Sequence, residues 1–171
     1  MQTYAIGDIH GQYDLMMRAF DRIETDRRRE GAPDSPVVVL GDLVDRGPNS
    51  AGVIAHLFER QQTDDTLIVL KGNHDRMFSI FLEDPFGRDP RLRAEYTWMH
   101  PRLGGPETLA SYGIREPANR PTVQVHAEAL AAVPPAHRRW LADLPLFHQR
   151  DEAIFVHAGI RPGVPLAAQT E

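Results

Sequence analysis

Cysteine is absent from this chain of 171 residues. Its absence excludes disulfide bonds, thiolate metal sites and a cysteine nucleophile, so the side chains left to bind a metal are aspartate, histidine and asparagine. The chain also lacks an apolar run close to the ~20 residues that a membrane span needs. Its first residues show no basic segment followed by a long apolar stretch. We therefore expect no membrane association, no signal peptide and a cytoplasmic location.

Positive charge is scarce relative to negative charge. The sequence has 19 lysine and arginine residues against 24 aspartate and glutamate residues, a formal net charge of −5. This balance argues against a general nucleic-acid binder, which usually presents a basic surface. A phosphorylated substrate is not excluded, because a bound metal can supply local positive charge. Length and a hydrophobic fraction of 42% predict a single folded domain over residues 1–171.

Short apolar runs alternate with helical patterns in the first half of the chain. The runs at 4–6, 37–40 and 66–70 each end at or just before a glycine that precedes an aspartate or asparagine, and helical stripes lie between them. This order predicts an α/β fold with a parallel sheet and right-handed crossovers. In such sheets ligands bind at the carboxyl ends of the strands. The recurring polar residues at the strand ends therefore predict a binding site.

The second half is expected to contain more helices and a hairpin. Proline and glycine interrupt residues 83–121, which we interpret as an irregular, cap-like insertion. Trp98 within it is expected to pack in the core. Helices are predicted at 76–82, 91–99, 106–112, 123–132 and 136–143, and strands at 145–149 and 153–157.

The side chains that follow the predicted strands provide mixed oxygen and nitrogen ligands. They are Asp8, His10, Asp42, Asp45, Arg46, Asn73, His74 and His157. Such a set suits manganese, iron or zinc better than magnesium or calcium. Asp42, the central carboxylate, is the natural bridge between two metals, which would clamp a phosphoryl group and generate a bridging hydroxide. The fork of Arg46 suits a phosphate, although an ordinary surface ion pair with Asp45 is an alternative.

Four motifs together carry a family resemblance. They are Gly7-Asp8-Ile9-His10-Gly11, Gly41-Asp42-Leu43-Val44-Asp45-Arg46-Gly47, Gly72-Asn73-His74-Asp75 and His157-Ala158-Gly159. In order and spacing they resemble the metallophosphoesterase signature of the phosphoprotein phosphatase family, most of all its bacterial serine/threonine phosphatase branch. The resemblance implies a calcineurin-like α/β/β/α sandwich with two divalent metal ions at the strand carboxyl ends. Manganese is the expected metal, with iron and zinc as alternatives.

The resemblance also implies a role for each residue. One metal would be bound by Asp8, His10 and Asp42, and the other by Asp42, Asn73 and His157. Arg46 would hold the phosphate, His74 would protonate the leaving alkoxide, and Asp45 would orient His74. A histidine beside a carboxylate is held in one tautomer and kept basic enough to carry a proton.

Two departures from the family pattern affect these expectations. The family supplies one more metal-binding histidine and a second phosphate-binding arginine beyond the His-Ala-Gly loop, and neither is found before Glu171. The sequence therefore resembles a member truncated at its C-terminus. Asp75 stands where the protein phosphatases usually carry glutamate. Aspartate is common there in the related diadenosine tetraphosphate hydrolases, but those usually lose the carboxylate at the position of Asp45.

The sequence thus predicts a metal-dependent phosphomonoester hydrolase, with a serine/threonine protein phosphatase as the first choice. Its substrate would be a phosphorylated protein or a small phosphoester. One alternative is a diadenosine tetraphosphate hydrolase. Another is a truncated domain that binds metal or a partner with little turnover. The oligomeric state stays open.

Overall fold

The first half of the chain forms a parallel three-stranded sheet. The computed structural model describes residues 2–93, 95–151 and 153–169. Strands β1 (Tyr4–Ile6), β2 (Val37–Val39) and β3 (Leu67–Val69) lie in the order β1-β2-β3. The central strand β2 is three buried valines, as expected for a parallel strand covered on both faces. The predicted parallel α/β architecture is confirmed.

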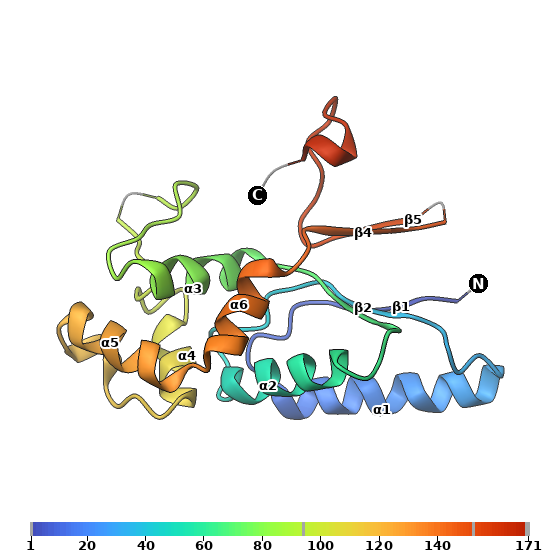
Figure 1. Ribbon diagram of the computed structural model, residues 1–171, viewed down its shortest axis with the longest axis horizontal. Coiled ribbons are helices and arrows are strands. Elements are labelled where there is room, and N and C mark those ends of the chain that lie inside the picture. The colour runs from blue at the N-terminus through green and yellow to red at the C-terminus, as the bar shows by residue number, and fades with distance from the viewer. Residues whose placement is uncertain (1, 94, 152, 170–171) are drawn as a thin grey trace.

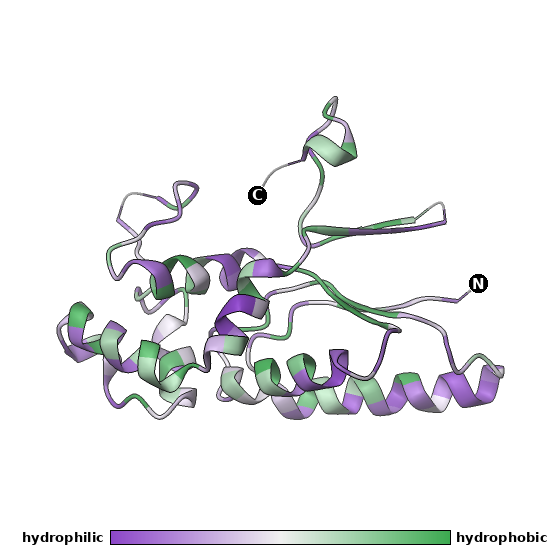
Figure 2. Cartoon of the chain, viewed as in Figure 1, coloured by the Kyte–Doolittle hydropathy of each residue, from purple (hydrophilic) through white to green (hydrophobic). Residues whose placement is uncertain are grey.

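Helices α1 (Tyr13–Glu30) and α2 (Ser50–Gln61) cover one face of this sheet (Figure 1). Met16, Phe20 and Ile23 of α1 are buried, at the spacing of one helical face. The helix runs to Glu30 and ends at Gly31, whose φ of 64° is left-handed, as is common just past a helix C-terminus. The outward side of α1 is hydrophilic, whereas β2 and β3 are apolar (Figure 2).

The second sheet is the antiparallel hairpin of β4 (Phe147–Arg150) and β5 (Ala153–Val156). It lies on the side of the parallel sheet away from α1 and α2 (Figure 1). The Lys71 N–H donates to the carbonyl of Pro145 over 2.9 Å, which fixes the chain that leads into the hairpin. Beyond the hairpin the chain forms the short 3-10 helix η2 (Leu166–Ala168). The predicted hairpin is confirmed, although Glu152 of its turn lies outside the described residues.

The remaining helices gather at the other end of the molecule. They are α3 (Asn73–Glu83), α4 (Gly105–Ser111), the 3-10 helix η1 (Pro117–Asn119), α5 (Thr122–Ala132) and α6 (Pro135–Asp143). Helix α3 begins three residues before its predicted start. It contacts α5 and α6, and α4 packs on α2. None of the helices in the described parts of the chain has the length and apolarity needed to span a membrane.

The helix predicted at 91–99 is wrong for the residues that the structure describes there. Asp89 Oδ1 accepts the Arg91 N–H over 2.9 Å, which favours a turn over a helix. Successive hydrogen bonds then join residues three apart, from Leu92 N to Asp89 O and from Tyr96 N to Arg93 O. Such a chain of turns leaves the segment irregular.

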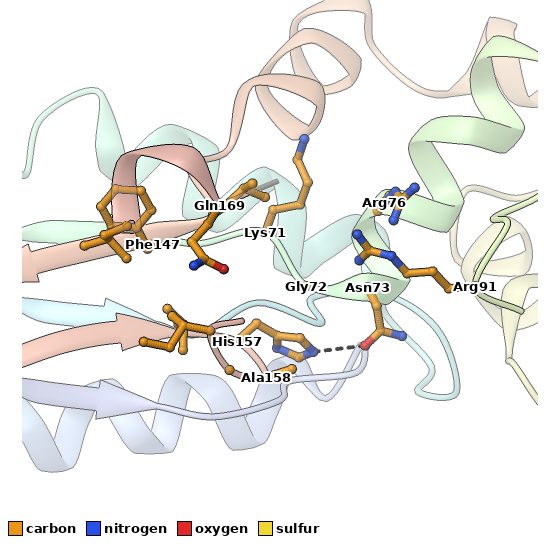
Figure 3. Close-up of a pocket in the computed structure, with 14 residues that line it drawn as sticks. Lys71, Gly72, Asn73, Arg76, Arg91, Phe147, His157, Ala158 and Gln169 are labelled. Carbon is orange, nitrogen blue, oxygen red and sulfur yellow. Dashed lines mark hydrogen bonds between the residues drawn. The ribbon is translucent and has the colours of Figure 1, made fainter. Parts of the chain in front are cut away.

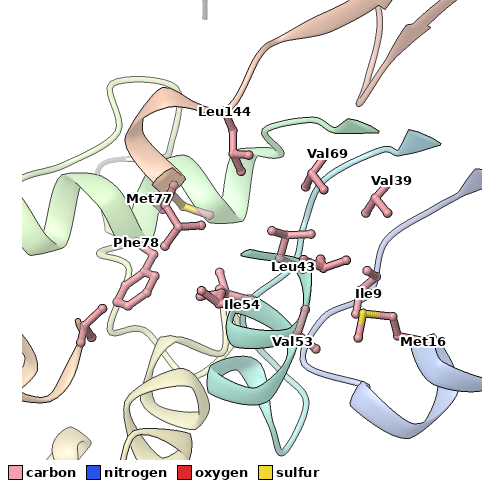
Figure 4. Packing of buried hydrophobic residues seen from close by; sticks show 14 of the residues in the cluster. Ile9, Met16, Val39, Leu43, Val53, Ile54, Val69, Met77, Phe78 and Leu144 are labelled. Atoms are coloured by element: carbon pink, nitrogen blue, oxygen red, sulfur yellow. The ribbon is translucent and has the colours of Figure 1, made fainter. Parts of the chain in front are cut away.

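One hydrophobic core joins the parallel sheet to the helices α1 to α6. It contains strand residues such as Val39 and Val69, Met16 of α1, Ile54 of α2, and Met77 and Phe78 of α3 (Figure 4). Residues 83–121 also contribute to it, because Trp98, Leu109 and Ile114 are buried in the same cluster. Trp98 stacks on Phe78 with ring centroids 5.0 Å apart. Its predicted place in the core is confirmed, whereas the single-domain and cap-like interpretations stay predictions.

Candidate metal centre

All eight side chains predicted for the site meet at one edge of the parallel sheet. They come from the loops after β1 and β2, from the first turn of α3 and from the end of β5. A network of contacts below 4.0 Å joins Asp8, His10, Asp42, Asp45, Arg46, Asn73, His74 and His157. Strands ending at the same edge bring these residues together, as the sequence predicted.

The loops that carry these residues have an unusual backbone. His10, Asp42, Asp45 and Arg46 have φ values of 45°, 52°, 74° and 66°, in the left-handed region that non-glycine residues rarely adopt. Backbone strain of this kind collects at functional sites, where the surrounding structure holds it. A Cβ atom on Gly72 would collide with the backbone and side chain of Asp42, so only glycine allows the loops after β2 and β3 to approach so closely.

Asp75 ties these two loops to each other. Its buried carboxylate accepts the backbone N–H groups of Leu43 and Gly72, each over 2.8 Å. Burial raises the pKa of Asp75 to about 6, although the two backbone donors act in the opposite direction and the neighbouring charge of Asp42 adds to the rise. The side chain thus fixes the first turn of α3, and with it Asn73 and His74, against the loop that holds Asp42.

Asp42 lies between two imidazole rings. Its Oδ2 is 3.6 Å from Nε2 of His10, and its Oδ1 is 3.4 Å from Nε2 of His157. The carboxylate is buried, and Oδ1 also accepts the backbone N–H of His74 over 2.9 Å. Each oxygen of Asp42 therefore faces a different histidine, an arrangement in which the carboxylate can bridge two cations.

Backbone carbonyls set the tautomer of both histidines. Nδ1 of His10 lies 2.8 Å from the carbonyl oxygen of Val44, and Nδ1 of His157 lies 2.9 Å from that of Leu40. A carbonyl oxygen can only accept, so in each ring Nδ1 carries the hydrogen and the neutral ring presents the Nε2 lone pair to the site. This is the arrangement of metal-binding histidines, whose second nitrogen donates to a carbonyl or carboxylate.

Hydrogen-bond acceptors meet around Nε2 of His157, as a cation site requires. Oδ1 of Asn73 lies 3.0 Å from Nε2 of His157 (dashed in Figure 3), and Oδ1 of Asp42 lies 3.4 Å from it. Three acceptor atoms thus converge, and a divalent cation satisfies all of them at once.

Asp8 lies between the two histidines. Its Oδ2 is 3.9 Å from Nε2 of His10, and its Oδ1 is 3.9 Å from Nδ1 of His157. Two sets of possible ligand atoms share Asp42, and within each set all the atoms lie within 4.8 Å of one another. One set adds His10 and His74 to Asp42, and the other adds Asp8 and His157. The sequence analysis placed Asp8 with His10 and Asp42 in one ligand set, whereas its carboxylate lies 3.9 Å from both His10 and His157.

His74 and Asp45 form a buried pair beside these clusters. Nδ1 of His74 donates to Oδ2 of Asp45 over 2.6 Å. Two further donors reach the same carboxylate: Trp98 Nε1, at 2.9 and 3.1 Å from its two oxygens, and Thr108 Oγ1, at 2.8 Å from Oδ1. Burial raises the pKa of Asp45, and the hydrogen bonds from His74, Thr108 and Trp98 lower it in part. Sequence reasoning missed Thr108 and the polar role of Trp98, because neither residue lies in a motif.

Arg46 connects the pair to the metal-ligand clusters. Its Nη1 is 2.8 Å from Nε2 of His10, and its Nη2 is 3.1 Å from Nε2 of His74. The Arg46 N–H donates to the carbonyl of Gly104 over 3.3 Å. The guanidinium therefore lies at the centre of the site, where it can bind two oxygens of a phosphate at once.

A search with protein-family models supports this interpretation. The model for calcineurin-like phosphoesterases matches residues 1–162. The chain belongs to the calcineurin-like phosphoesterase family. Members of this family use a dinuclear metal centre, and the paired clusters around Asp42 provide the ligand types for one.

The curated relatives match this chain over different shares of its length. The symmetrical bis(5'-nucleosyl)-tetraphosphatase of Acidovorax sp. (strain JS42) is 30% identical over 95% of this chain and 45% of its own length. The asymmetrical bis(5'-nucleosyl)-tetraphosphatase of Halalkalibacterium halodurans is 28% identical over 94% of this chain and 58% of its own. Serine/threonine-protein phosphatase 1 of Salmonella typhimurium is 34% identical, but over only 44% of this chain and 30% of its own length.

The chain spans about half the length of the tetraphosphatases that it matches almost throughout. A crystal structure provisionally described as a diadenosine tetraphosphatase has the same fold, with a TM-score of 0.51 and 22% identity over 98% of this chain and 54% of its own. The sequence analysis placed a protein phosphatase first. The relatives that match most of the chain favour its alternative, a dinucleoside polyphosphate hydrolase.

Proposed function

We propose that this phosphoesterase is a metal-dependent hydrolase of dinucleoside polyphosphates. The observation that carries the proposal is the position of Asp42 between His10 and His157, whose Nε2 atoms are both turned toward it by backbone carbonyls. The names of the relatives that match most of the chain support the substrate class.

Two sets of residues would hold the metals. Asp8, His10 and Asp42 would form one set, and Asp42, Asn73 and His157 would form the other, with Asp8 within reach of both histidines. Two bound divalent cations would supply Lewis acidity at phosphorus and an activated water. We expect manganese, with iron or zinc as alternatives, and a cytoplasmic location.

The remaining side chains position the phosphate and the proton. Arg46 would bind two oxygens of the scissile phosphate and stabilise the charge that develops on them. Nε2 of His74, which Arg46 approaches to 3.1 Å, would hold the proton for the leaving oxygen. Asp45 would keep the ring oriented through the 2.6 Å hydrogen bond to Nδ1 and favour its protonated form.

A serine/threonine phosphatase is the second candidate, because of the buried His74–Asp45 pair. A serine alkoxide is a strongly basic leaving group and needs a proton donor, whereas a phosphate leaves a nucleoside polyphosphate with little help. A donor this well held therefore favours a phosphomonoester more than a phosphoanhydride. The third reading, a metal-binding domain with little turnover, predicts low rates on both substrates.

The substrate class is tested by comparing kcat/KM for diadenosine tetraphosphate with that for a phosphothreonine peptide, both with added manganese. We expect a clear preference for the dinucleotide. A preference for the peptide would support the protein phosphatase. Negligible rates on both, from a folded protein that binds manganese, would support the binding domain.

A further inference from the structure

A pocket opens beside the metal-ligand clusters. Its volume is about 160 Å³, and its lining includes Asn73 and His157, which also belong to the site (Figure 3). One part of its wall is apolar and includes Phe147 and Leu166, and another is cationic. The volume is below the roughly 300–1,000 Å³ of a typical pocket for a whole small ligand. It suits a single ring system of a larger molecule.

Three cationic side chains line this pocket. Lys71 Nζ donates to the carbonyl of Ala142 over 2.7 Å, and Arg76 lies 3.5 Å from the carboxylate of Asp89, so both are held in place. Arg91 is exposed, and Figure 3 shows its guanidinium turned toward Asn73. A guanidinium in this position can reach a phosphate that follows one bound at the metal-ligand clusters.

A second hollow of about 190 Å³ continues from the first. It shares Arg91, Gly159 and Gln169 with the pocket, and Arg161 is among the residues that line it alone. Gln169 fixes the turn that carries Arg161, because its Oε1 accepts the Arg161 N–H over 2.8 Å and its Nε2 donates to the carbonyls of Arg161 and Val164. Arg91 and Arg161 thus mark a path that leads away from Asn73, which we call the basic strip.

The charge of the basic strip differs from that of the whole chain. Among the described residues, no aspartate or glutamate lines either hollow. The guanidinium groups of Arg91 and Arg161 make no hydrogen bond or ion pair with any residue that the structure describes. The sequence as a whole carries a formal net charge of −5. A local cationic surface on an acidic protein attracts and orients an anionic ligand.

We propose that the basic strip binds the phosphates that follow the scissile phosphate of a nucleoside polyphosphate, and that the pocket wall around Phe147 receives the base. The inference rests on the proposed function and names the features that would select its substrate. A polyphosphate chain carries several charges in a row, which match two guanidinium groups along a path. A singly phosphorylated peptide offers no second phosphate to them.

The test compares Arg91→Gln and Arg161→Gln with Arg93→Gln. Arg93 is an exposed arginine of the same segment that lines neither hollow, so its replacement controls for lost charge. KM is measured with manganese for diadenosine tetraphosphate and for p-nitrophenyl phosphate, which has no further phosphate. Binding of diadenosine tetraphosphate is measured separately by calorimetry in EDTA, where no turnover occurs.

We expect Arg91→Gln to raise both KM and Kd for the dinucleotide about tenfold, since a charge-assisted hydrogen bond is lost. Arg161→Gln should have a smaller effect in the same direction. KM for p-nitrophenyl phosphate should stay within about twofold, and Arg93→Gln should resemble the wild type.

Three results would each contradict binding by the basic strip. They are unchanged KM and Kd for the dinucleotide in Arg91→Gln, an equal rise of KM for p-nitrophenyl phosphate in that variant, and no binding of the dinucleotide to the wild type in EDTA. If the wild type binds the dinucleotide through Arg91 but does not hydrolyse it, the strip stands and the proposed function fails.

Discussion

Trp98 donates its indole N–H to the carboxylate of Asp45, with Nε1 at 2.9 Å from Oδ2 and 3.1 Å from Oδ1. The two residues are 53 positions apart in the sequence. The same indole stacks on Phe78 of α3. The segment between α3 and α4 thereby reaches the His74–Asp45 pair, and the orientation of His74 depends on how this segment packs.

The first prediction concerns this contact. Trp98→Phe keeps an aromatic ring on Phe78 but removes one donor to a buried carboxylate. We expect kcat on phosphoserine to fall about tenfold and the free energy of unfolding to fall by about 1–3 kcal/mol. Steady-state kinetics and urea denaturation measure the two effects. Trp140→Phe is the matched control, since Trp140 Nε1 donates to Gln61 Oε1 over 2.8 Å outside the site. Equal loss of kcat in both variants would contradict a specific role for Trp98.

The second prediction uses the leaving group to test His74. If His74 supplies the proton, His74→Asn should slow hydrolysis of phosphoserine by roughly 100-fold or more. Hydrolysis of diadenosine tetraphosphate should fall by less than about tenfold, because its leaving phosphate is far less basic. His100→Asn, a histidine that packs on Tyr96, serves as the control. The same fold-loss on both substrates would show that His74 does not act as the acid.

The third prediction is a metal stoichiometry. His157→Ala removes the imidazole that faces Asn73 and Asp42, while the other proposed ligand set, Asp8, His10 and Asp42, is left intact. The manganese content, measured by elemental analysis after dialysis, should therefore fall from about two ions per chain in the wild type to about one in the variant. A ratio of two in the variant would remove His157 from the ligand set.

The fourth prediction concerns pH and stability. Burial lowers the pKa of His56 and of His137, whose rings pack on Phe20 and Phe58. The unfolded chain then binds protons more readily than the folded chain once the pH falls below about 6.5. Their contribution to stability is present above that pH and is lost on acidification.

Urea denaturation in EDTA between pH 7.5 and 5 measures this loss. The double variant His56→Gln, His137→Gln should show a shallower decline of the unfolding free energy with falling pH. The wild type and the double variant are compared by the slope of the unfolding free energy against pH. A loss of stability that is the same at every pH does not change this slope. Identical slopes would exclude the two histidines as its source.

Much of the fold and most of the candidate site were predictable because their signals are local. The valines of β2 mark a buried strand, and Asp42 follows at the edge where ligands bind. Aligned strand ends then bring the other predicted residues together without further information. The hairpin of β4 and β5 was also predictable, since the segments 145–149 and 153–157 flank a short charged turn.

Contacts set by tertiary packing could not be predicted in the same way. Thr108 and Trp98 reach Asp45 only after α4 and the preceding turns have packed on α2 and α3. The turn that Asp89 begins also overrides a helical pattern, since one side-chain hydrogen bond to Arg91 N redirects the backbone. The basic strip combines Arg91 with Arg161, and no motif relates these two positions.

The central claim is tested most directly by manganese-dependent hydrolysis of diadenosine tetraphosphate by the wild type and by Asp42→Asn. Asp65→Asn, which changes an exposed aspartate away from the site, is the control. The account predicts turnover that requires manganese in the wild type and the control, and loss of nearly all of it in Asp42→Asn. Turnover that persists in Asp42→Asn, or its absence from a wild-type protein with two bound manganese ions, would contradict the account.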